Sequence, residues 1–315
     1  MKKAVIVILL HAMTFFTSCE NGNVRKLNEK SNYNTTAGIY IPFSDTLSSN
    51  HIILKATVNN KPAYLLLDNG TMPNEYLILF KPFAARAQII DTLKPFRIEA
   101  DRIANSSVLL SLSGLEDSIK NTVIKQLHML TAQKNVPDGI LGMGFLKRYI
   151  VEINYEMRYL QLHDTASYKV PNKYKEVTFK PPYTGPFRQL DAEFCIGHKS
   201  IKESISIDIG LGVDGFFFGL PKYLKYQHML QSSLNGNISE SYFVFSKSKN
   251  MNIVIDSVHI AGKTVKHIPA TVEIESSASY DAILFGNNVL QRFKKVYFNF
   301  AANKIYLPEN EIGNN

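Results

Sequence analysis

The chain has no tryptophan, only two cysteines and no long hydrophobic run in its body, and these shortages exclude several classes of protein. Two cysteines cannot build a disulfide scaffold or a four-cysteine metal site. Beyond the N-terminus no 18 consecutive apolar residues occur without charges, so we expect no membrane-spanning helix. The eight histidines lack metal-ligand spacing, and no Gly-X-Ser-X-Gly elbow is present. We therefore expect no metal, no other cofactor and no serine-hydrolase chemistry.

Long blocks of one charge are also missing. The formal net charge is +8, but Lys and Arg are spread along the chain in nothing longer than pairs. The aromatic residues do not alternate with them in the pattern of a nucleic-acid-binding module. We expect a solvated basic surface and no nucleic-acid partner.

The N-terminus carries the one strongly apolar segment. Met1-Lys2-Lys3 precedes a largely apolar run that ends at Phe16, which is too short to span a bilayer and predicts a secretion signal over residues 1–19. The run closes on Phe16-Thr-Ser-Cys19, which resembles a bacterial lipobox. Ordinary cleavage is the alternative, because Leu is usual at position 16. The polar residues 20–37 predict a tether, so we expect an exported protein of the periplasm or cell envelope, lipid-anchored through Cys19 to the outer membrane.

Whether Cys195 can form a disulfide depends on whether Cys19 is lipidated. If Cys19 is acylated, Cys195 has no intramolecular partner, and a disulfide between them would require an unmodified Cys19. Cys195 lies in a strand-like run, which predicts a buried, inert thiol.

What the chain has in abundance favours strands. Of 315 residues 45% are apolar, with 19 Phe and 16 Tyr, and Val, Ile and Thr are frequent. This composition predicts an all-β protein with enough apolar residues for two domains. An early hairpin is predicted where Asn59-Asn60-Lys61 separates two strand-like runs.

The two halves of the chain repeat with a period of roughly 140 residues. In each half a strand-like run ends in an Asp-X-Gly turn. A second Asp farther along, Asp138 or Asp281, opens a short apolar run that ends in Gly, and a Leu-X-Arg-aromatic stretch and two further strands follow. The matching segments are 64–71, 137–142, 146–149, 153–155 and 159–162 in the first half and 205–210, 281–286, 290–293, 297–300 and 304–307 in the second. The repeat predicts an N-terminal lobe (38–167), a linker (168–175), a C-terminal lobe (176–310) and a tail (311–315).

These motifs resemble the retropepsin-like and pepsin-like aspartic peptidases. Tyr64-Leu-Leu-Leu-Asp-Asn-Gly-Thr71 and Ile205-Ser-Ile-Asp-Ile-Gly210 resemble the two aspartate loops, and the resemblance covers roughly residues 38–308. It implies two homologous β-barrel lobes about a pseudo-two-fold axis with a cleft between them. It also implies catalytic carboxylates at Asp68 and Asp208, and structural roles for Gly142 and Gly286 beside the two loops.

The resemblance implies supporting roles for the loop residues Asn69, Gly70, Thr71, Ile209 and Gly210. Thr71 is expected to hydrogen-bond the outer oxygen of Asp68. The family usually has Thr or Ser where this chain has Asn69 and Ile209, and Ile cannot make the hydroxyl's cross-loop hydrogen bond. We therefore expect Ile209→Thr to restore that bond and raise activity, whereas the turn residues Asp138 and Asp281 are expected to be structural.

Two functions follow from the resemblance. Two like charges at about 3 Å hold one proton between them, so the pair can activate a water for peptide-bond hydrolysis. The first function is thus an aspartic endopeptidase acting on a peptide or protein substrate. The alternative is a weak or inactive relative that binds peptides in the cleft, which the apolar Ile209 and Leu211 favour.

Overall fold

The computed structural model describes residues 38–44, 50–89, 93–96, 98–104, 106–126, 136–181, 187–231, 238–243, 246–276 and 279–309. The predicted signal segment, tether and C-terminal tail, and with them Cys19, lie outside these ranges. Strands dominate the described residues, which confirms the all-β class. No helix within these ranges is both long and apolar enough to cross a membrane.

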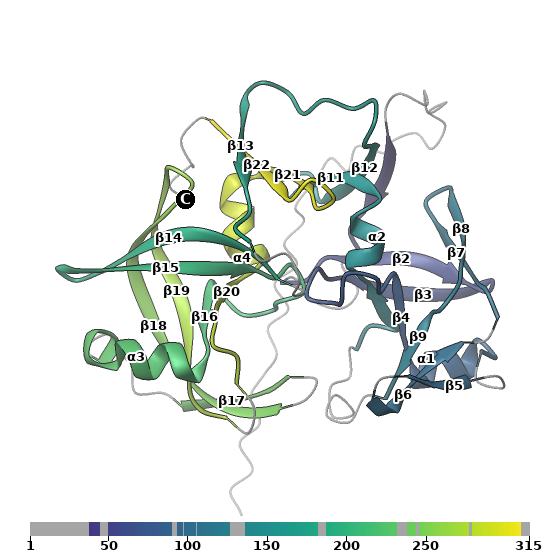
Figure 1. The fold of residues 1–315 in the computed structure, drawn as a ribbon, viewed down its shortest axis with the longest axis horizontal. Coiled ribbons are helices and arrows are strands. Elements are labelled where there is room, and N and C mark those ends of the chain that lie inside the picture. Colours follow the sequence, from purple (N-terminus) through teal and green to yellow (C-terminus); the bar gives the residue numbers. More distant parts are fainter. Residues whose placement is uncertain are drawn as a thin grey trace, which may run out of the picture. The chain divides into compact units, whose positions relative to one another are not determined.

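The first half of the chain forms a nine-stranded sheet in the order β5-β6-β9-β4-β10-β3-β2-β7-β8 (Figure 1). Its elements are β2 (Ile53–Val58), β3 (Lys61–Leu67), β4 (Leu77–Phe80), α1 (Lys81–Arg86), β5 (Leu93–Phe96), β6 (Ile98–Ala104), β7 (Val108–Leu112), β8 (Leu115–Ile119), β9 (Val123–Lys125) and β10 (Gly139–Leu141). Asn59 and Asn60 both have positive φ, 47° and 61°, in the turn between β2 and β3. The predicted tight hairpin is therefore confirmed.

The second half forms a seven-stranded sheet in the order β14-β15-β20-β16-β19-β18-β17, and β14 also pairs with β18. The first six of these strands thus close into a barrel, with β17 outside the ring. Its elements are β14 (Arg188–Ile196), β15 (Lys199–Ile207), β16 (Phe216–Phe218), α3 (Leu220–Leu230), β17 (Ile238–Phe243), β18 (Ser246–Ile260), β19 (Lys263–Ser276) and β20 (Ile283–Phe285). Positive φ at Gly197 and at Ala261-Gly262 makes the β14–β15 and β18–β19 turns.

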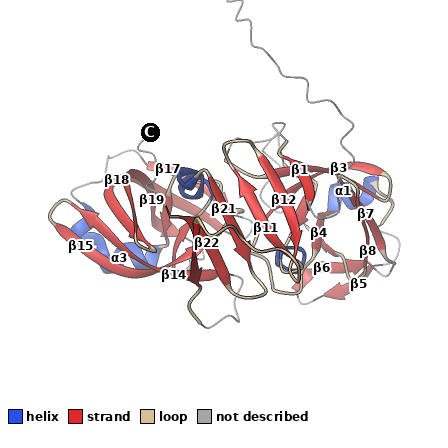
Figure 2. Ribbon diagram, turned by 90° about the horizontal axis from the view of Figure 1, so that it is seen from above, coloured by secondary structure: helices blue, strands red, loops and turns tan. Residues whose placement is uncertain are grey.

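A third sheet takes three strands from each half, in the order β1-β12-β11-β21-β22-β13. They are β1 (Ile39–Pro42), β11 (Tyr149–Asn154), β12 (Tyr159–Asp164), β13 (Tyr174–Thr178), β21 (Lys295–Asn299) and β22 (Lys304–Pro308). Figure 2 shows β12, β11 and β21 side by side. The helices α2 (Met143–Leu146), α4 (Asn287–Leu290) and η3 (Gln291–Phe293) lead into β11 and β21.

The two halves use the same pairings around their Asp-X-Gly turns. In the first half β10 runs parallel to β3 and antiparallel to β4, and β4 runs parallel to β9. In the second half β20 runs parallel to β15 and antiparallel to β16, and β16 runs parallel to β19. The repeat seen in the sequence therefore corresponds to a repeat in strand pairing.

Two features differ from the sequence-based prediction. Helices α1 and α3 were not predicted, because the composition favours strands. Each has Pro in its first turn, at Pro82 and Pro221, a position where Pro suits the start of a helix. The predicted linker 168–175 is partly ordered into the sheet: β13 begins at Tyr174 and pairs with β22, and Tyr168 stacks on His163 with ring centroids 3.6 Å apart. The last two residues of the predicted linker are thus part of a strand, because they pair with β22, and the sequence of the linker does not reveal this pairing.

Candidate active site

The Asp68 and Asp208 loops are built alike. Each aspartate directly follows a buried strand end, Leu67 of β3 or Ile207 of β15. Its backbone N–H donates to the neighbouring parallel strand, at 3.0 Å from Asp68 to the Leu141 carbonyl and at 2.9 Å from Asp208 to the Phe285 carbonyl. A rigid strand end thus fixes the backbone of each carboxylate.

The glycines of both turns hold the carboxylates by their backbone. Gly70 N–H donates to Asp68 Oδ1 at 2.5 Å and Gly210 N–H donates to Asp208 Oδ1 at 2.9 Å. A Cβ atom at position 210 would lie 2.4 Å from Asp68 Cγ, so only glycine allows the two loops this close approach. Gly70 and Gly210 therefore have the supporting positions that the sequence predicts.

The structure brings the Asp68 and Asp208 side chains together, and their carboxyl groups hydrogen-bond to each other. Both residues are half-buried, so the pair lies among protein atoms yet keeps an accessible surface. Burial raises the pKa of Asp68. Burial also raises the pKa of Asp208 well above its usual value, and the negative charge of Asp68 adds to that shift. One proton is therefore retained by the pair at pH values where an exposed aspartate has lost its own.

Asn69 joins the two loops. Its side chain is fully buried, Nδ2 donates to the Ile207 carbonyl at 2.8 Å, and Oδ1 accepts from the Ile209 N–H at 2.7 Å. One amide thus makes two hydrogen bonds to the strand end and turn that carry Asp208. Since each is a buried bond between segments far apart in sequence, Asn69 fixes the relative position of the two carboxylates.

One expectation about the loops requires correction. Ile209 does not leave a cross-loop hydrogen bond unmade, because its N–H already donates to Asn69; its side chain is fully buried in the core. Ile209→Thr would therefore place a hydroxyl in apolar surroundings rather than restore a bond. The Thr71 hydroxyl accepts from the Met143 N–H at 2.8 Å, which uses only its acceptor side, so the expected donation to Asp68 stays a prediction.

No model of a known protein family matches this chain, and no curated protein matches it. The chemistry of the site is therefore inferred from its geometry. Within the described ranges, no three His, Cys, Asp or Glu side chains gather as ligands for a metal ion.

Several residues near the Asp208 loop were not predicted as part of the site. Asn287 Nδ2 donates to the Ile209 carbonyl at 2.7 Å, and the Tyr155 hydroxyl donates to Asn287 Oδ1 at 2.9 Å. His51 contacts the Gly210 backbone; burial lowers the pKa of its imidazole, and that contact opposes the shift. The repeat could have indicated Asn287, because it follows Gly286 as Met143 follows Gly142, but His51 and Tyr155 gave no comparable signal.

Gly142 and Gly286 lie where the sequence predicts, beside the aspartate loops. A Cβ atom at position 142 would lie 2.4 Å from Thr71 Oγ1, and one at position 286 would lie 2.7 Å from the Asp208 carbonyl oxygen. Each glycine also precedes the first residue of a short helix, α2 or α4. A side chain at position 142 or 286 would therefore displace the loop that carries Asp68 or Asp208, respectively.

The remaining predicted residues lie outside the pair. Asp138 accepts from the Tyr64 N–H at 2.9 Å and pairs with Arg86, and Asp281 is a largely exposed turn residue 3.7 Å from Lys222. Both lie in bends outside the carboxylate pair. Cys195 is a free thiol that is only partly buried, so the prediction of a buried thiol was too strong.

Proposed function

We propose that this protein is an aspartic-type endopeptidase with two homologous lobes related by a pseudo-two-fold axis. The observation that carries the proposal is the hydrogen-bonded pair of carboxyl groups at Asp68 and Asp208, both with raised pKa values, at the ends of two strands with the same pairings. Pairs of carboxyl groups whose environment keeps one proton between them are suited to general acid–base chemistry. A peptide or protein substrate would lie extended between the lobes.

The two carboxyl groups take different parts in the proposed reaction. Burial raises the pKa of both carboxyl groups, so the pair keeps one proton between them. The protonated carboxyl group donates a hydrogen bond to the scissile carbonyl oxygen. The ionised carboxylate accepts a proton from a water molecule, whose oxygen attacks the carbonyl carbon. The tetrahedral intermediate then collapses as a carboxyl group protonates the leaving nitrogen. This scheme needs no covalent intermediate and no cofactor.

The test is cleavage of a mixed peptide library by the full mature chain between pH 3 and 7, followed by mass spectrometry. Wild type is expected to cut best in mildly acid solution, where the singly protonated pair is most populated. Asp68→Asn is expected to abolish cleavage at every pH, while Asp281→Asn, which changes an exposed turn carboxylate, should leave it intact. Wild-type protein that is folded and cuts no library peptide would rule out the endopeptidase.

A peptide-binding protein without catalysis is the second candidate. It is favoured by the surroundings of Asp208: Leu211 offers no hydroxyl beside this carboxyl group. Asp208 therefore lacks at that position the hydroxyl partner that the resemblance implies. Peptide binding that persists without turnover in the same library experiment would select this candidate.

We also propose that the protein is exported and held at the cell envelope by a lipid on Cys19. The lipobox-like segment 16–19 and the polar tether behind it support this. Cys19→Ser is expected to move the protein from the membrane fraction to the soluble fraction. An unmodified N-terminus at or beyond residue 19 in the membrane-associated protein, found by mass spectrometry, would contradict it.

A further inference from the structure

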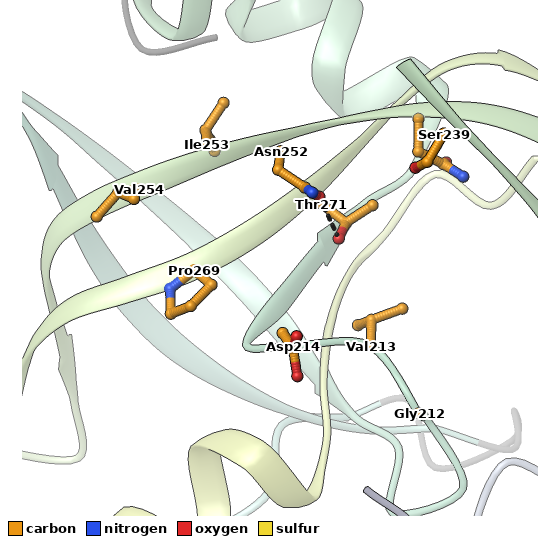
Figure 3. Close-up of a pocket in the computed structure, with 10 residues that line it drawn as sticks. Gly212, Val213, Asp214, Ser239, Asn252, Ile253, Val254, Pro269 and Thr271 are labelled. Atoms are coloured by element: carbon orange, nitrogen blue, oxygen red, sulfur yellow. Dashed lines mark hydrogen bonds between the residues drawn. The ribbon is translucent and has the colours of Figure 1, made fainter. Parts of the chain in front are cut away.

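A pocket is lined in part by the segment that follows the Asp208 loop. It has a volume of about 410 Å³ and is lined by the loop segment Gly212, Val213 and Asp214 and by residues of β17, β18 and β19. Figure 3 shows the loop that carries Val213 and Asp214 facing the strands that carry Asn252, Pro269 and Thr271. Pockets of this size accept small ligands or individual side chains of a larger one.

The lining combines one acidic group with apolar surface. Among the described residues, Asp214 is the single charged one in the lining, and the apolar walls come from Val213, Ile253, Val254 and Pro269. The polar side chains of the lining are neutral, and the Thr271 hydroxyl hydrogen-bonds to Asn252. An apolar wall that ends at one carboxylate is complementary to Lys or Arg, whose aliphatic stem packs on apolar surface while the cation reaches a charged partner.

The Asp214 carboxylate is held in place without being neutralised. Its Oδ1 accepts from Asn288 Nδ2 at 2.8 Å and from Asn50 Nδ2 at 3.3 Å, and both donors are uncharged amides. Asn288 Nδ2 also donates to the Val213 carbonyl at 3.1 Å, which fixes the loop beneath the carboxylate. The side chain is exposed, so the negative charge remains available to a ligand cation.

The pocket is continuous with the proposed catalytic loop. Gly212 lines it and lies two residues beyond Gly210, whose backbone holds the Asp208 carboxylate. Ser239 of β17 also lines it, and β17 is the last strand in the order of the described sheet. An extended peptide can hydrogen-bond to such an edge strand while placing alternate side chains in neighbouring pockets.

We propose that this pocket is a specificity subsite that binds a Lys or Arg side chain of the peptide substrate through Asp214. The inference rests on the proposed function for the presence of a peptide at the Asp208 loop. It identifies the substrate class as peptides with a basic residue at one fixed distance from the scissile bond. A cationic side chain is selected there over an apolar one of equal length, because only the cation pairs with the carboxylate.

The experiment measures binding rather than cleavage, in full-length mature protein that carries Asp208→Asn to prevent turnover. The probes are fluorescent peptides in which a single Lys, or its uncharged isostere norleucine, is moved along an otherwise neutral sequence. At one position Lys is expected to bind about fivefold more tightly than norleucine, the size of effect typical of a part-exposed ion pair. The preference should weaken as salt is raised.

Asp214→Asn in the same background is expected to remove the preference while retaining the norleucine affinity, since Asn keeps an oxygen that accepts from Asn50 and Asn288. Asp191→Asn is the matched control: it removes an exposed carboxylate of the same sheet that does not line the pocket, and it should leave the preference unchanged. Equal binding of Lys and norleucine peptides at every position, no binding at all, or a preference that survives Asp214→Asn would overturn the subsite. Failure of wild type to cleave, with the Lys preference intact, would instead reject the endopeptidase alone.

Discussion

Asp208→Asn is expected to abolish peptide cleavage and at the same time to make the folded protein more stable at neutral pH. The loss of rate is about 10²- to 10⁴-fold, the usual contribution of a general acid or base. The gain in stability arises because burial and the Asp68 charge disfavour ionised Asp208 in the folded state, whereas the unfolded chain ionises freely. An uncharged amide of the same shape removes that conflict.

The effect of Asp208→Asn on stability should depend on pH, and its direction follows from the raised pKa of Asp208. Because the folded pKa of Asp208 lies above the unfolded value of 3.8, the folded state of wild type binds the proton more tightly than the unfolded state. The stability that protonated Asp208 contributes should therefore be fully present below about pH 3.8 and should be lost as pH rises through the raised folded pKa. The amide side chain of the variant cannot ionise, so Asp208→Asn should escape this loss: its Tm should exceed that of wild type by about 2 °C or more near pH 7 and match it near pH 3.

The measurement is thermal unfolding from pH 3 to 8, paired with the cleavage assay. Asp281→Asn serves as the control, because it removes a largely exposed carboxylate and should change neither Tm nor rate. If Asp208→Asn is less stable than wild type at neutral pH, the surroundings stabilise the ionised carboxylate of Asp208. That result would contradict the hypothesis that Asp68 and Asp208 share one proton.

Asn69→Ala is expected to have the largest effect on stability among substitutions at the site. It leaves the Ile209 N–H and the Ile207 carbonyl oxygen without their buried partner, at a cost of about 2 to 4 kcal/mol for the two groups. Turnover should fall by a factor on the order of 10², because a shift of about 1 Å between the carboxyl groups is enough for that. Denaturant unfolding and single-turnover cleavage measure the two effects separately.

The control for Asn69 is Asn74→Ala, which removes an exposed amide from the segment that follows the same aspartate. It should alter unfolding by a few tenths of a kcal/mol at most. Asn69→Asp adds a further test, since it keeps an acceptor for the Ile209 N–H but loses the donor to the Ile207 carbonyl. Asn69→Ala with wild-type stability would mean that water replaces both hydrogen bonds.

The sequence was informative where local pattern decides the structure. The Asn59-Asn60 turn, the strand ends before Asp68 and Asp208 and the glycines at 142 and 286 all follow from residue type and from the repeat. Such features depend on neighbours along the chain or on a comparison of the chain with itself.

What could not be predicted depends on side chains that meet across long separations. Asn69 looked like a departure from the expected hydroxyl, because no pattern reveals that its amide reaches Ile207 and Ile209. The Tyr155–Asn287 hydrogen bond joins residues 132 positions apart, and although the repeat marks Asn287, nothing along the chain pairs it with Tyr155. The pocket at Asp214 likewise arises from a loop and three strands that only the folded chain brings together.

The central pairing of the six-stranded sheet has a consequence for how the chain folds. Val151 of β11 lies opposite Phe298 of β21, so this contact forms only after almost the whole chain has been synthesised. Until then β11 presents an open strand edge, its apolar residues uncovered on one side, to every other chain nearby. Contacts of such long range are also slow to form, because a large loop must close first. Until β21 is present to pair with β11, the first half of this molecule therefore carries an unpaired strand edge of the kind that favours edge-to-edge association.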